Sequence, residues 1–348
     1  MELLIPHSRV EFDEVAIEAV RSVLQSGRVA TGEKVHRLEV ELEARFQRPF
    51  ACVTSGTAAL HLTLLAFGIG PGFRMAVPSF ICPSIHYCLE YVGVKPVLYD
   101  CGRLGIGVSS ESLEAAVTGS DGFIIPHTFG FLTDFDQRLM KGRLCIEDCC
   151  QATGAMVDGH VAGTRGQASI QSFYATKMVG SGDGGAVSGS PELIEWVRSR
   201  SNHRGHDDLI CRYPYSMSDL HAILVHAQLE QLPRNIDLRR RIAERYVSEF
   251  SDLPIETPAI TSPSVWYRFP IITPVPRDKL IKEARQRGIG FGFGVRTPLH
   301  RLLNWDPACF PNAEKAMRNL VSLPIYPGLK ETQQEQIVDL IRQVVTHP

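Results

Sequence analysis

The sequence predicts an α/β fold in which a large domain with a mostly parallel central sheet carries a smaller C-terminal α+β domain. Its 348 residues exceed what a single hydrophobic core usually supports. The middle of the chain alternates short β-rich runs with amphipathic stretches, which is typical of a parallel sheet covered by helices. Further along, charged helical segments and proline-rich turns replace this alternation. We therefore expect a large domain over residues 1–232 and a small domain over residues 233–348.

Seven β-rich runs are expected to form the sheet of the large domain, and helices are expected to separate most of them. The runs are short and rich in apolar residues, as strands buried on both faces are. The strands are expected at 51–54, 75–77, 94–99, 122–126, 143–148, 169–174 and 185–188, and the helices at 13–24, 57–67, 84–91, 112–116 and 191–200.

A long helix is expected to begin near Ser218, with Ser216 and Ser218 as candidate N-caps. The segment LHAILVHAQLEQL that follows has apolar residues at helical spacing. Because proline interrupts a helix interior, the helix is expected to end at Pro233, where we place the domain boundary. The small domain should then contain helical segments over 235–250 and 277–287 and a strand over 266–272.

Composition and charge favour a cytoplasmic protein that acts on small molecules. The 36 basic and 38 acidic residues nearly balance, and no long run of either sign suits a nucleic acid or an anionic membrane. The first ten residues lack the apolar stretch of a secretory signal, and no run of about 18 apolar residues occurs. The nine cysteines show no pairing pattern and are expected to be reduced thiols. HRGHDD at 203–208 lacks a third ligand of clear spacing, so no metal is expected there.

The segment SGTAALHLTLL, which begins at Ser55, predicts an anion site. A β-run ends, a Ser-Gly-Thr turn follows, and a helix begins whose free N–H groups face the turn. Taken alone, the same pattern also fits a serine that only caps a helix.

Two further positions contribute a carboxylate and an amine. Asp148 ends a β-run, at the sheet edge where open parallel sheets bind ligands, and there it can keep a pyridinium nitrogen protonated. A capping or salt-bridged aspartate is equally consistent with its position. Lys177 lies in a glycine-rich connection after the run that contains Ser172, where desolvation would lower its pKa and free the amine for an imine bond. The alternative is a loop lysine exposed to solvent.

The order of these three groups is more specific than any one of them. An anion site, a strand-end aspartate and a glycine-flanked lysine are what pyridoxal 5'-phosphate (PLP) requires for its phosphate, its ring nitrogen and its imine. The sequence therefore predicts a PLP enzyme that holds its cofactor as a Schiff base on Lys177.

Over nearly its whole length the chain resembles the DegT/StrS sugar aminotransferases of the aspartate-aminotransferase fold. The resemblance rests on motifs that include SGTAALHLTLLAFGIGPG, PSFICPSI, GVKPVLYD, IEDCCQATGA, SFYATK, GDGGAV, MSDLHAILVHAQLEQL, TPLH and SLPIYPGL. It implies the PLP-dependent transferase fold type I and a homodimer with PLP near the subunit interface. It also implies glutamate or glutamine as amino donor and a keto sugar, usually nucleotide-linked, as acceptor in amino-sugar biosynthesis.

The resemblance assigns roles to individual residues. By this resemblance, Lys177 is similar to the imine lysine. Some relatives carry a histidine at that position, and those enzymes dehydrate sugars instead of aminating them. Asp148 is similar to the partner of the ring nitrogen, and Gln151 to the neighbour of the ring hydroxyl. The phosphate cradle corresponds to Ser55, Gly56, Thr57 and Ser172.

The sequence departs from the family pattern around the ring face and the substrate. Cys82 stands where relatives carry an aromatic residue that stacks on the PLP ring. RYPYS at 212–216 has lost the asparagine that reaches across the dimer to the phosphate. In GVRTPLH, a glycine and a valine replace the usual histidine and tyrosine, and Arg296 adds a guanidinium that we expect to orient an anionic substrate group. The alternative is that Arg296 faces solvent or pairs with Asp306.

Two interpretations accommodate these departures: a divergent aminotransferase with an unusual acceptor, and a PLP-binding protein that acts as a sensor or scaffold. Intact Lys177 and Asp148 favour the enzyme, because a scaffold needs neither. A nicotinamide enzyme is suggested by GIGFGFG at 288–294, but this segment follows a helix and lacks the acidic residue of a dinucleotide-binding unit.

Overall fold

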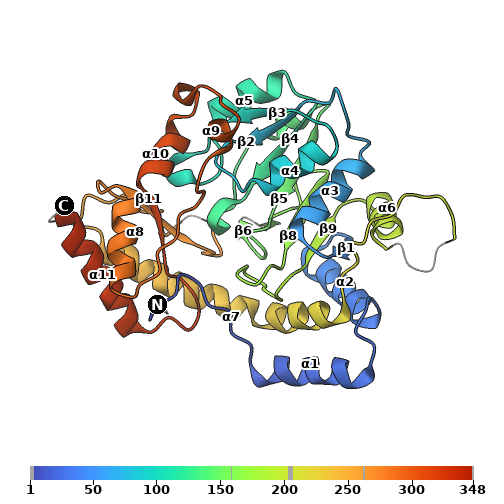
Figure 1. Cartoon of the computed structure of the whole chain (residues 1–348), viewed down its shortest axis with the longest axis horizontal. Helices are drawn as coiled ribbons and strands as arrows, with labels where there is room; N and C mark the ends of the chain where they lie inside the picture. Colours follow the sequence, from blue (N-terminus) through green and yellow to red (C-terminus); the bar gives the residue numbers. More distant parts are fainter. Residues whose placement is uncertain (1–3, 158, 203–206, 262, 347–348) are drawn as a thin grey trace.

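A seven-stranded sheet forms the centre of the protein. The computed structural model describes residues 4–157, 159–202, 207–261 and 263–346. The strand order is β1-β9-β8-β5-β4-β2-β3. Strands β3, β2, β4, β5 and β8 run parallel, whereas β9 is antiparallel to both β8 and β1. The expectation of a mostly parallel sheet is confirmed (Figure 1).

Each of the seven expected strands forms, with ends shifted by no more than two residues. Strands β2, β4 and β8 are buried at every position, because helices or loops cover both faces of the sheet. The strands are β1 (Phe50–Val53), β2 (Met75–Pro78), β3 (Pro96–Tyr99), β4 (Gly122–Pro126), β5 (Leu144–Asp148), β8 (Ala168–Ser172) and β9 (Gly185–Ser188).

Helices form at all of the positions predicted between the strands. They are α1 (Glu14–Ser26), α3 (Gly56–Ala66), α4 (Ser84–Tyr91), α5 (Ser110–Thr118) and α6 (Pro191–Ser201). A further helix, α2 (Glu33–Phe46), was not predicted, although its buried residues Leu38 and Leu42 have helical spacing. Short elements complete this part: 3-10 turns η1 (Arg103–Gly105), η2 (Thr128–Gly130) and η3 (Gln137–Met140), and the hairpin of β6 (Met156–Val157) and β7 (His160–Val161).

Helix α7 (Asp219–Glu249) corrects one prediction. It begins after the N-cap Ser218, as expected, but it continues through Pro233, so the prediction that it ends there was wrong. A proline inside a helix costs about 3 kcal/mol. Buried residues on both sides of it, Leu229 and Tyr246 among them, continue the packed face of the helix and offset that cost. The boundary placed between residues 232 and 233 therefore lies within one continuous helix.

The C-terminal part packs around a two-stranded antiparallel sheet. Its elements are β10 (Phe269–Ile272), α8 (Arg277–Gln286), α9 (Leu299–Leu302), η4 (Pro307–Cys309), α10 (Pro311–Asn319), β11 (Leu320–Leu323) and α11 (Glu331–Thr346). The start of the chain also lies here, because Ile5 forms a parallel bridge with Ile289. The segment 288–294 leads into extended bridges and not into a helix, unlike the phosphate turn of a nicotinamide enzyme.

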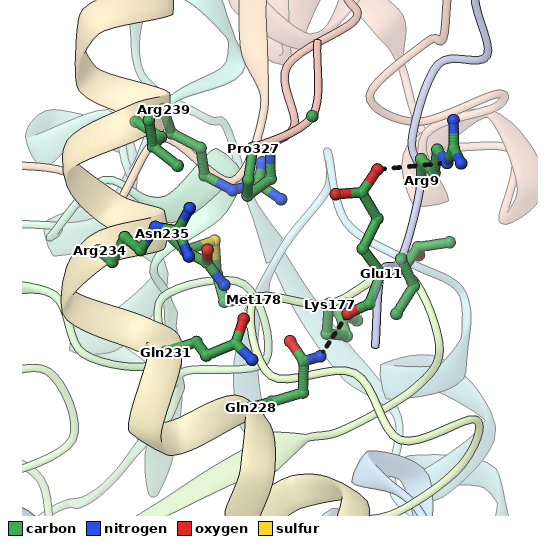
Figure 2. Close-up of a pocket in the computed structure, with 14 residues that line it drawn as sticks. Arg9, Glu11, Lys177, Met178, Gln228, Gln231, Arg234, Asn235, Arg239 and Pro327 are labelled. Carbon is green, nitrogen blue, oxygen red and sulfur yellow. Dashed lines mark hydrogen bonds and ion pairs between the residues drawn. The ribbon is translucent and has the colours of Figure 1, made fainter. Parts of the chain in front are cut away.

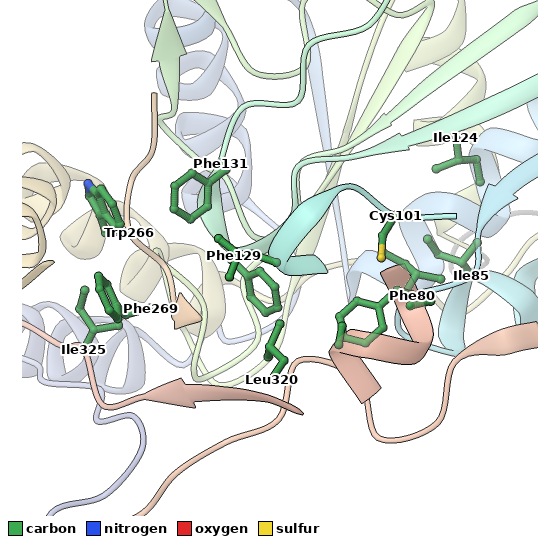
Figure 3. Close-up of a cluster of buried hydrophobic side chains, with 14 of the residues drawn as sticks. Phe80, Ile85, Cys101, Ile124, Phe129, Phe131, Trp266, Phe269, Leu320 and Ile325 are labelled. Atoms are coloured by element: carbon green, nitrogen blue, oxygen red, sulfur yellow. The ribbon is translucent and has the colours of Figure 1, made fainter. Parts of the chain in front are cut away.

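One hydrophobic core joins the two parts of the molecule (Figure 3). Phe80 and Phe131 come from loops of the large sheet, and Trp266, Phe269 and Leu320 come from the C-terminal part. The rings of Phe131 and Trp266 meet edge to face with centroids 5.0 Å apart. This packing fixes the segment around Trp266 against the carboxyl edge of the large sheet, where the site lies.

No helix in the described ranges is both long and apolar enough to cross a membrane. All nine cysteines are free thiols, as expected. Most of the HRGHDD segment, residues 203–206, falls outside the described part of the chain.

Candidate active site

Eight of the nine site residues predicted from the sequence line a single cavity of about 380 Å³. The cavity lies where β5 ends, where α3 begins and where the loop between β8 and β9 passes. These eight residues are Ser55, Gly56, Thr57, Cys82, Asp148, Gln151, Ser172 and Lys177. The topology brings them together because the carboxyl ends of parallel strands meet at one edge of a sheet.

The start of α3 forms the anion end of the cavity. Ser55 is the N-cap, and its Oγ accepts a hydrogen bond from the N–H of Ala58 at 3.0 Å, so the capping alternative is correct as well. Gly56 and Thr57 open the first helical turn, whose N–H groups lack intrahelical acceptors. An ideal Cβ on Gly56 would lie 3.0 Å from both Cys150 Sγ and Ser172 Cβ. Glycine therefore lets the start of α3 pack closely against Ser172 and Cys150.

Asp148 ends β5 with its carboxylate held by the following turn. Its Oδ1 accepts a hydrogen bond from the N–H of Cys150 at 3.0 Å. Gln151 is fixed in the same turn, because its Oε1 accepts from the N–H of Phe129 at 2.7 Å. Both side chains are thus held in place before any ligand binds.

The adjacent Glu147 belongs to a separate, buried network. With His127 and Cys149 it forms a group whose ligand atoms lie within 4.8 Å of one another, as metal ligands do. The Glu147 carboxylate accepts hydrogen bonds from His127 Nε2 (2.9 Å) and from three backbone N–H groups, and the second ring nitrogen of His127 accepts from Thr133. Protein donors therefore satisfy this group, and it is a structural network.

Lys177 lies in the loop between β8 and β9, partly buried, with its backbone N–H bonded to the carbonyl of Tyr174 at 2.8 Å. The loop is tight: a Cβ on Gly180 would lie 2.2 Å from the carbonyl oxygen of Ala175. The expected lowering of the Lys177 pKa is wrong. Burial lowers it, but Tyr267, Cys150 and Asp148 together raise the pKa of the ammonium above its ordinary value.

Tyr267 is a site residue that the sequence reasoning missed. The centroid of its buried ring lies 5.3 Å from Lys177 Nζ. Its hydroxyl accepts a hydrogen bond from Arg268 Nη2 at 3.1 Å. Burial raises the pKa of the phenol, but Lys177 and Arg268 outweigh it and lower the pKa to about 8. No local motif marks Tyr267, because only the packing of the C-terminal part brings it to Lys177.

Comparison with known proteins agrees with this geometry. The model of the DegT/DnrJ/EryC1/StrS aminotransferase family matches residues 10–342. The chain belongs to this aminotransferase family. It is therefore an enzyme of a PLP-dependent family with fold type I, which favours the aminotransferase over the sensor or scaffold.

Solved structures of other members have the same fold. DesV of S. venezuelae, solved with a ketimine intermediate, is 28% identical with a TM-score of 0.86, and the match covers 95% of this chain and 94% of DesV. A DegT DnrJ EryC1 StrS aminotransferase from Brucella abortus is 26% identical with a TM-score of 0.86, over 97% and 100% of the two chains. The PLP form of Spr1654 from Streptococcus pneumoniae, 23% identical over 99% of each chain, shares the fold with a TM-score of 0.91.

The cavity of this family member fits PLP. The N-terminus of α3 suits a phosphate, Asp148 suits a protonated ring nitrogen, and Lys177 offers the amine. Gly56 and Ser172, which both line the cavity, lie close together at this end of it. Cys82 also lines the cavity, at the position predicted for the ring face.

Arg296 lies apart from the other predicted residues of the aminotransferase. It lines a different surface depression, together with Arg277 and Met317. Its side chain is exposed, and the guanidinium lies 4.8 Å from the ring centroid of Phe293. Its exposure agrees with the alternative that Arg296 faces solvent, whereas the pairing with Asp306 is not found among the described residues.

Proposed function

We propose that this enzyme transfers an amino group from glutamate or glutamine to a keto sugar, nucleotide-linked or a related polyol, in amino-sugar biosynthesis. One observation carries the proposal: a lysine amine, a strand-end carboxylate and a helix N-terminus line the same cavity. A PLP-dependent transfer requires these three groups, and a cavity that bound only a phosphate would need neither Lys177 nor Asp148.

The proposed roles follow from the positions of the side chains. PLP, when bound, supplies an electron sink for the carbon that loses its proton. Asp148 would keep the ring nitrogen protonated, and Gln151 would bond the ring hydroxyl. Lys177 would hold the cofactor and, when released, move the proton between the two carbons that exchange the amino group. The phosphate would be held by Ser55, Gly56, Thr57 and Ser172, and Cys82 would contact the ring face.

Assembly, location and the acceptor contact are part of the same proposal. A homodimer is supported by the family resemblance and by Tyr174, which lines the cavity yet is 54% exposed, as expected where a partner subunit would complete the site. A cytoplasmic location rests on composition. Arg296 is proposed to contact an anionic group of the acceptor from outside the cofactor cavity.

A half-reaction without any sugar tests the proposal. Glutamate added to PLP-loaded protein should release one 2-oxoglutarate per site and convert PLP to pyridoxamine phosphate. Borohydride reduction of a separate sample should fix PLP on the peptide that contains Lys177. The Lys177→Ala variant should lose that label, whereas the Lys330→Ala variant, changed at an exposed lysine, should keep it. Labelling of another lysine would contradict the proposed function. PLP binding that yields neither 2-oxoglutarate from glutamate nor 2-oxoglutaramate from glutamine would contradict it as well.

A further inference from the structure

Two cysteine thiols face the cofactor cavity from different walls. Cys82 belongs to the segment between β2 and α4, and Cys150 belongs to the turn that follows β5. Both line the same cavity of about 380 Å³, in which PLP would lie when bound. The proposed transfer reaction uses neither sulfur atom as a reactant, so Cys82 and Cys150, the thiol pair, are available for a second chemistry.

The remaining cysteines are either shielded from solvent or lie away from the cofactor. Five of them are buried, namely Cys52, Cys88, Cys101, Cys145 and Cys149. Burial raises the pKa of each of these five thiols above its ordinary value. Cys211 and Cys309 are exposed but do not belong to the described lining of the cofactor cavity. The thiol pair is therefore set apart from the other seven cysteines by its position.

Cys82 is the member of the pair that a reagent from solvent reaches first. Its side chain is exposed, and its sulfur accepts a hydrogen bond from Ser84 Oγ at 3.3 Å. Oxidation of a cysteine requires access, because the oxidant has to reach the sulfur atom. In PLP-free protein, the wall that carries Cys82 is open to a small oxidant.

Cys150 is less accessible and is fixed by its neighbours. Its backbone N–H donates to Asp148 Oδ1 at 3.0 Å, and its Sγ lies 3.0 Å from where a Cβ on Gly56 would be. Burial and Asp148 raise the pKa of the Cys150 thiol well above its ordinary value, and Lys177 opposes them. Cys150 is therefore a poor first target for an oxidant. Its place in the same cavity suits the second thiol of an oxidation site, which attacks the sulfur that has already been oxidised.

Lys177 lines both the cofactor cavity and a second cavity of about 220 Å³ (Figure 2). Arg9, Arg234 and Arg239 line the second cavity, and no cysteine occurs among the described residues of its wall. Oxidation of the thiol pair would therefore change the surroundings of Lys177 on the cofactor side alone. The expected result is a loss of affinity for PLP while the second cavity stays as it is.

We propose that peroxide joins Cys82 and Cys150 in a reversible disulfide when PLP is absent, and that this disulfide blocks the cofactor cavity. The inference rests on the proposed function in one respect, namely that PLP occupies this cavity. First, the sulfur of Cys82 attacks a peroxide oxygen, the O–O bond breaks, and Cys82 becomes a sulfenic acid with release of water. The sulfur of Cys150 then displaces the hydroxyl group as a second water, and the S–S bond forms. Two thiols are oxidised by two electrons, and one hydrogen peroxide is reduced to two waters.

The disulfide and the cofactor exclude each other. A disulfide holds its two Cβ atoms about 3.5–4.5 Å apart, so the segment that carries Cys82 has to close over the empty cavity. PLP, when bound between the two walls, prevents this closure. Oxidation therefore acts on protein that lacks its cofactor, and exchange with a low-molecular-weight thiol restores the open cavity.

Treatment of PLP-free protein with hydrogen peroxide, followed by removal of the peroxide, tests the inference. Peptide mapping should find Cys82 linked to Cys150, and the dissociation constant of PLP should rise at least about tenfold. Dithiothreitol should reverse both changes. Protein loaded with PLP before the treatment should keep both thiols, which mass spectrometry after alkylation measures.

Three variants locate the reaction. Cys82→Ser should form no disulfide, and its affinity for PLP should be the same before and after peroxide. Cys150→Ser should stop at the sulfenic acid of Cys82, which a dimedone probe labels. Cys309→Ser, changed at an exposed cysteine outside the lining of the cavity, should respond to peroxide as the parent does.

A parent protein whose Cys82 and Cys150 stay unlinked after peroxide would overturn the inference. A disulfide that forms equally well in PLP-loaded protein, or that leaves PLP binding unchanged, would overturn it too. The borohydride label on Lys177 of reduced protein separates the two proposals. A labelled protein without the disulfide retains the proposed function and loses the oxidation site, whereas a disulfide in a protein that never takes the label has the opposite meaning.

Discussion

Substitution of Gly56 by alanine should weaken PLP binding without unfolding the protein. The new Cβ would lie 3.0 Å from Cys150 Sγ and from Ser172 Cβ, and 3.4 Å from the carbonyl oxygen of Gln171. Carbon atoms at optimal contact are about 3.5–4.0 Å apart, so the start of α3 has to move by roughly half an ångström. Such overpacking typically costs about 1–3 kcal/mol.

The cost should appear in cofactor binding because the shift moves the phosphate-binding turn away from its ligand. One factor of ten in affinity corresponds to about 1.4 kcal/mol, so the dissociation constant of PLP should rise about 5- to 150-fold. The melting temperature of the PLP-free protein should change little, since alanine is favoured over glycine in a helix by up to about 1 kcal/mol and offsets part of the strain.

Titration of PLP-free protein with PLP, followed by absorbance, measures the effect. Gly70→Ala is the matched control, because a Cβ there meets its nearest neighbour, the carbonyl oxygen of Val92, at 3.9 Å. A Gly56→Ala protein that binds PLP within twofold of the parent would refute the assignment of the α3 turn as the phosphate cradle.

Three further predictions concern the chemistry. Asp148→Asn should retain PLP but slow 2-oxoglutarate release at least a hundredfold, because an amide cannot hold the ring nitrogen protonated; a loss below about tenfold would contradict this role. Tyr267→Phe removes a group that raises the Lys177 pKa, so the pH profile of the reaction of PLP with the PLP-free protein should shift to lower pH. An unshifted profile would show that the phenol does not act on Lys177. Arg296→Ala should raise KM for the acceptor about ten- to a hundredfold without changing KM for the donor, and unchanged acceptor kinetics would place Arg296 outside the substrate site.

Local patterns were sufficient for the sheet and the cofactor cavity. Each strand is a short apolar run, and the residues of the cradle follow strands at their carboxyl ends, where parallel topology requires them to converge. The positions of Gly56, Asp148 and Lys177 in one cavity could therefore be predicted from the order of their motifs.

Features that depend on long-range packing could not be predicted in this way. Pro233 carries a local signal for a helix end, but the packing of buried residues on both sides keeps α7 continuous. Burial of Lys177 suggested a lowered pKa, but the ring of Tyr267, from the distant C-terminal part, helps to reverse the direction. Arg296 belongs to the GVRTPLH motif, which was expected to contact the substrate. In the structure it lines a depression separate from the cavity that contains Lys177.

The sequence by itself determined which chemical groups the enzyme carries and the order in which its strands present them, because periodicity and turn residues act over a few neighbouring positions. Only the tertiary structure decided which distant groups share a cavity. Arg239 and Tyr267 lie near Lys177 because α7 and the segment before β10 fold against the loop that carries Lys177. The burial of the Arg239 guanidinium also follows from this packing and could not be read from the sequence. Electrostatic interactions extend through space and not along the chain, which is the physical reason for this division.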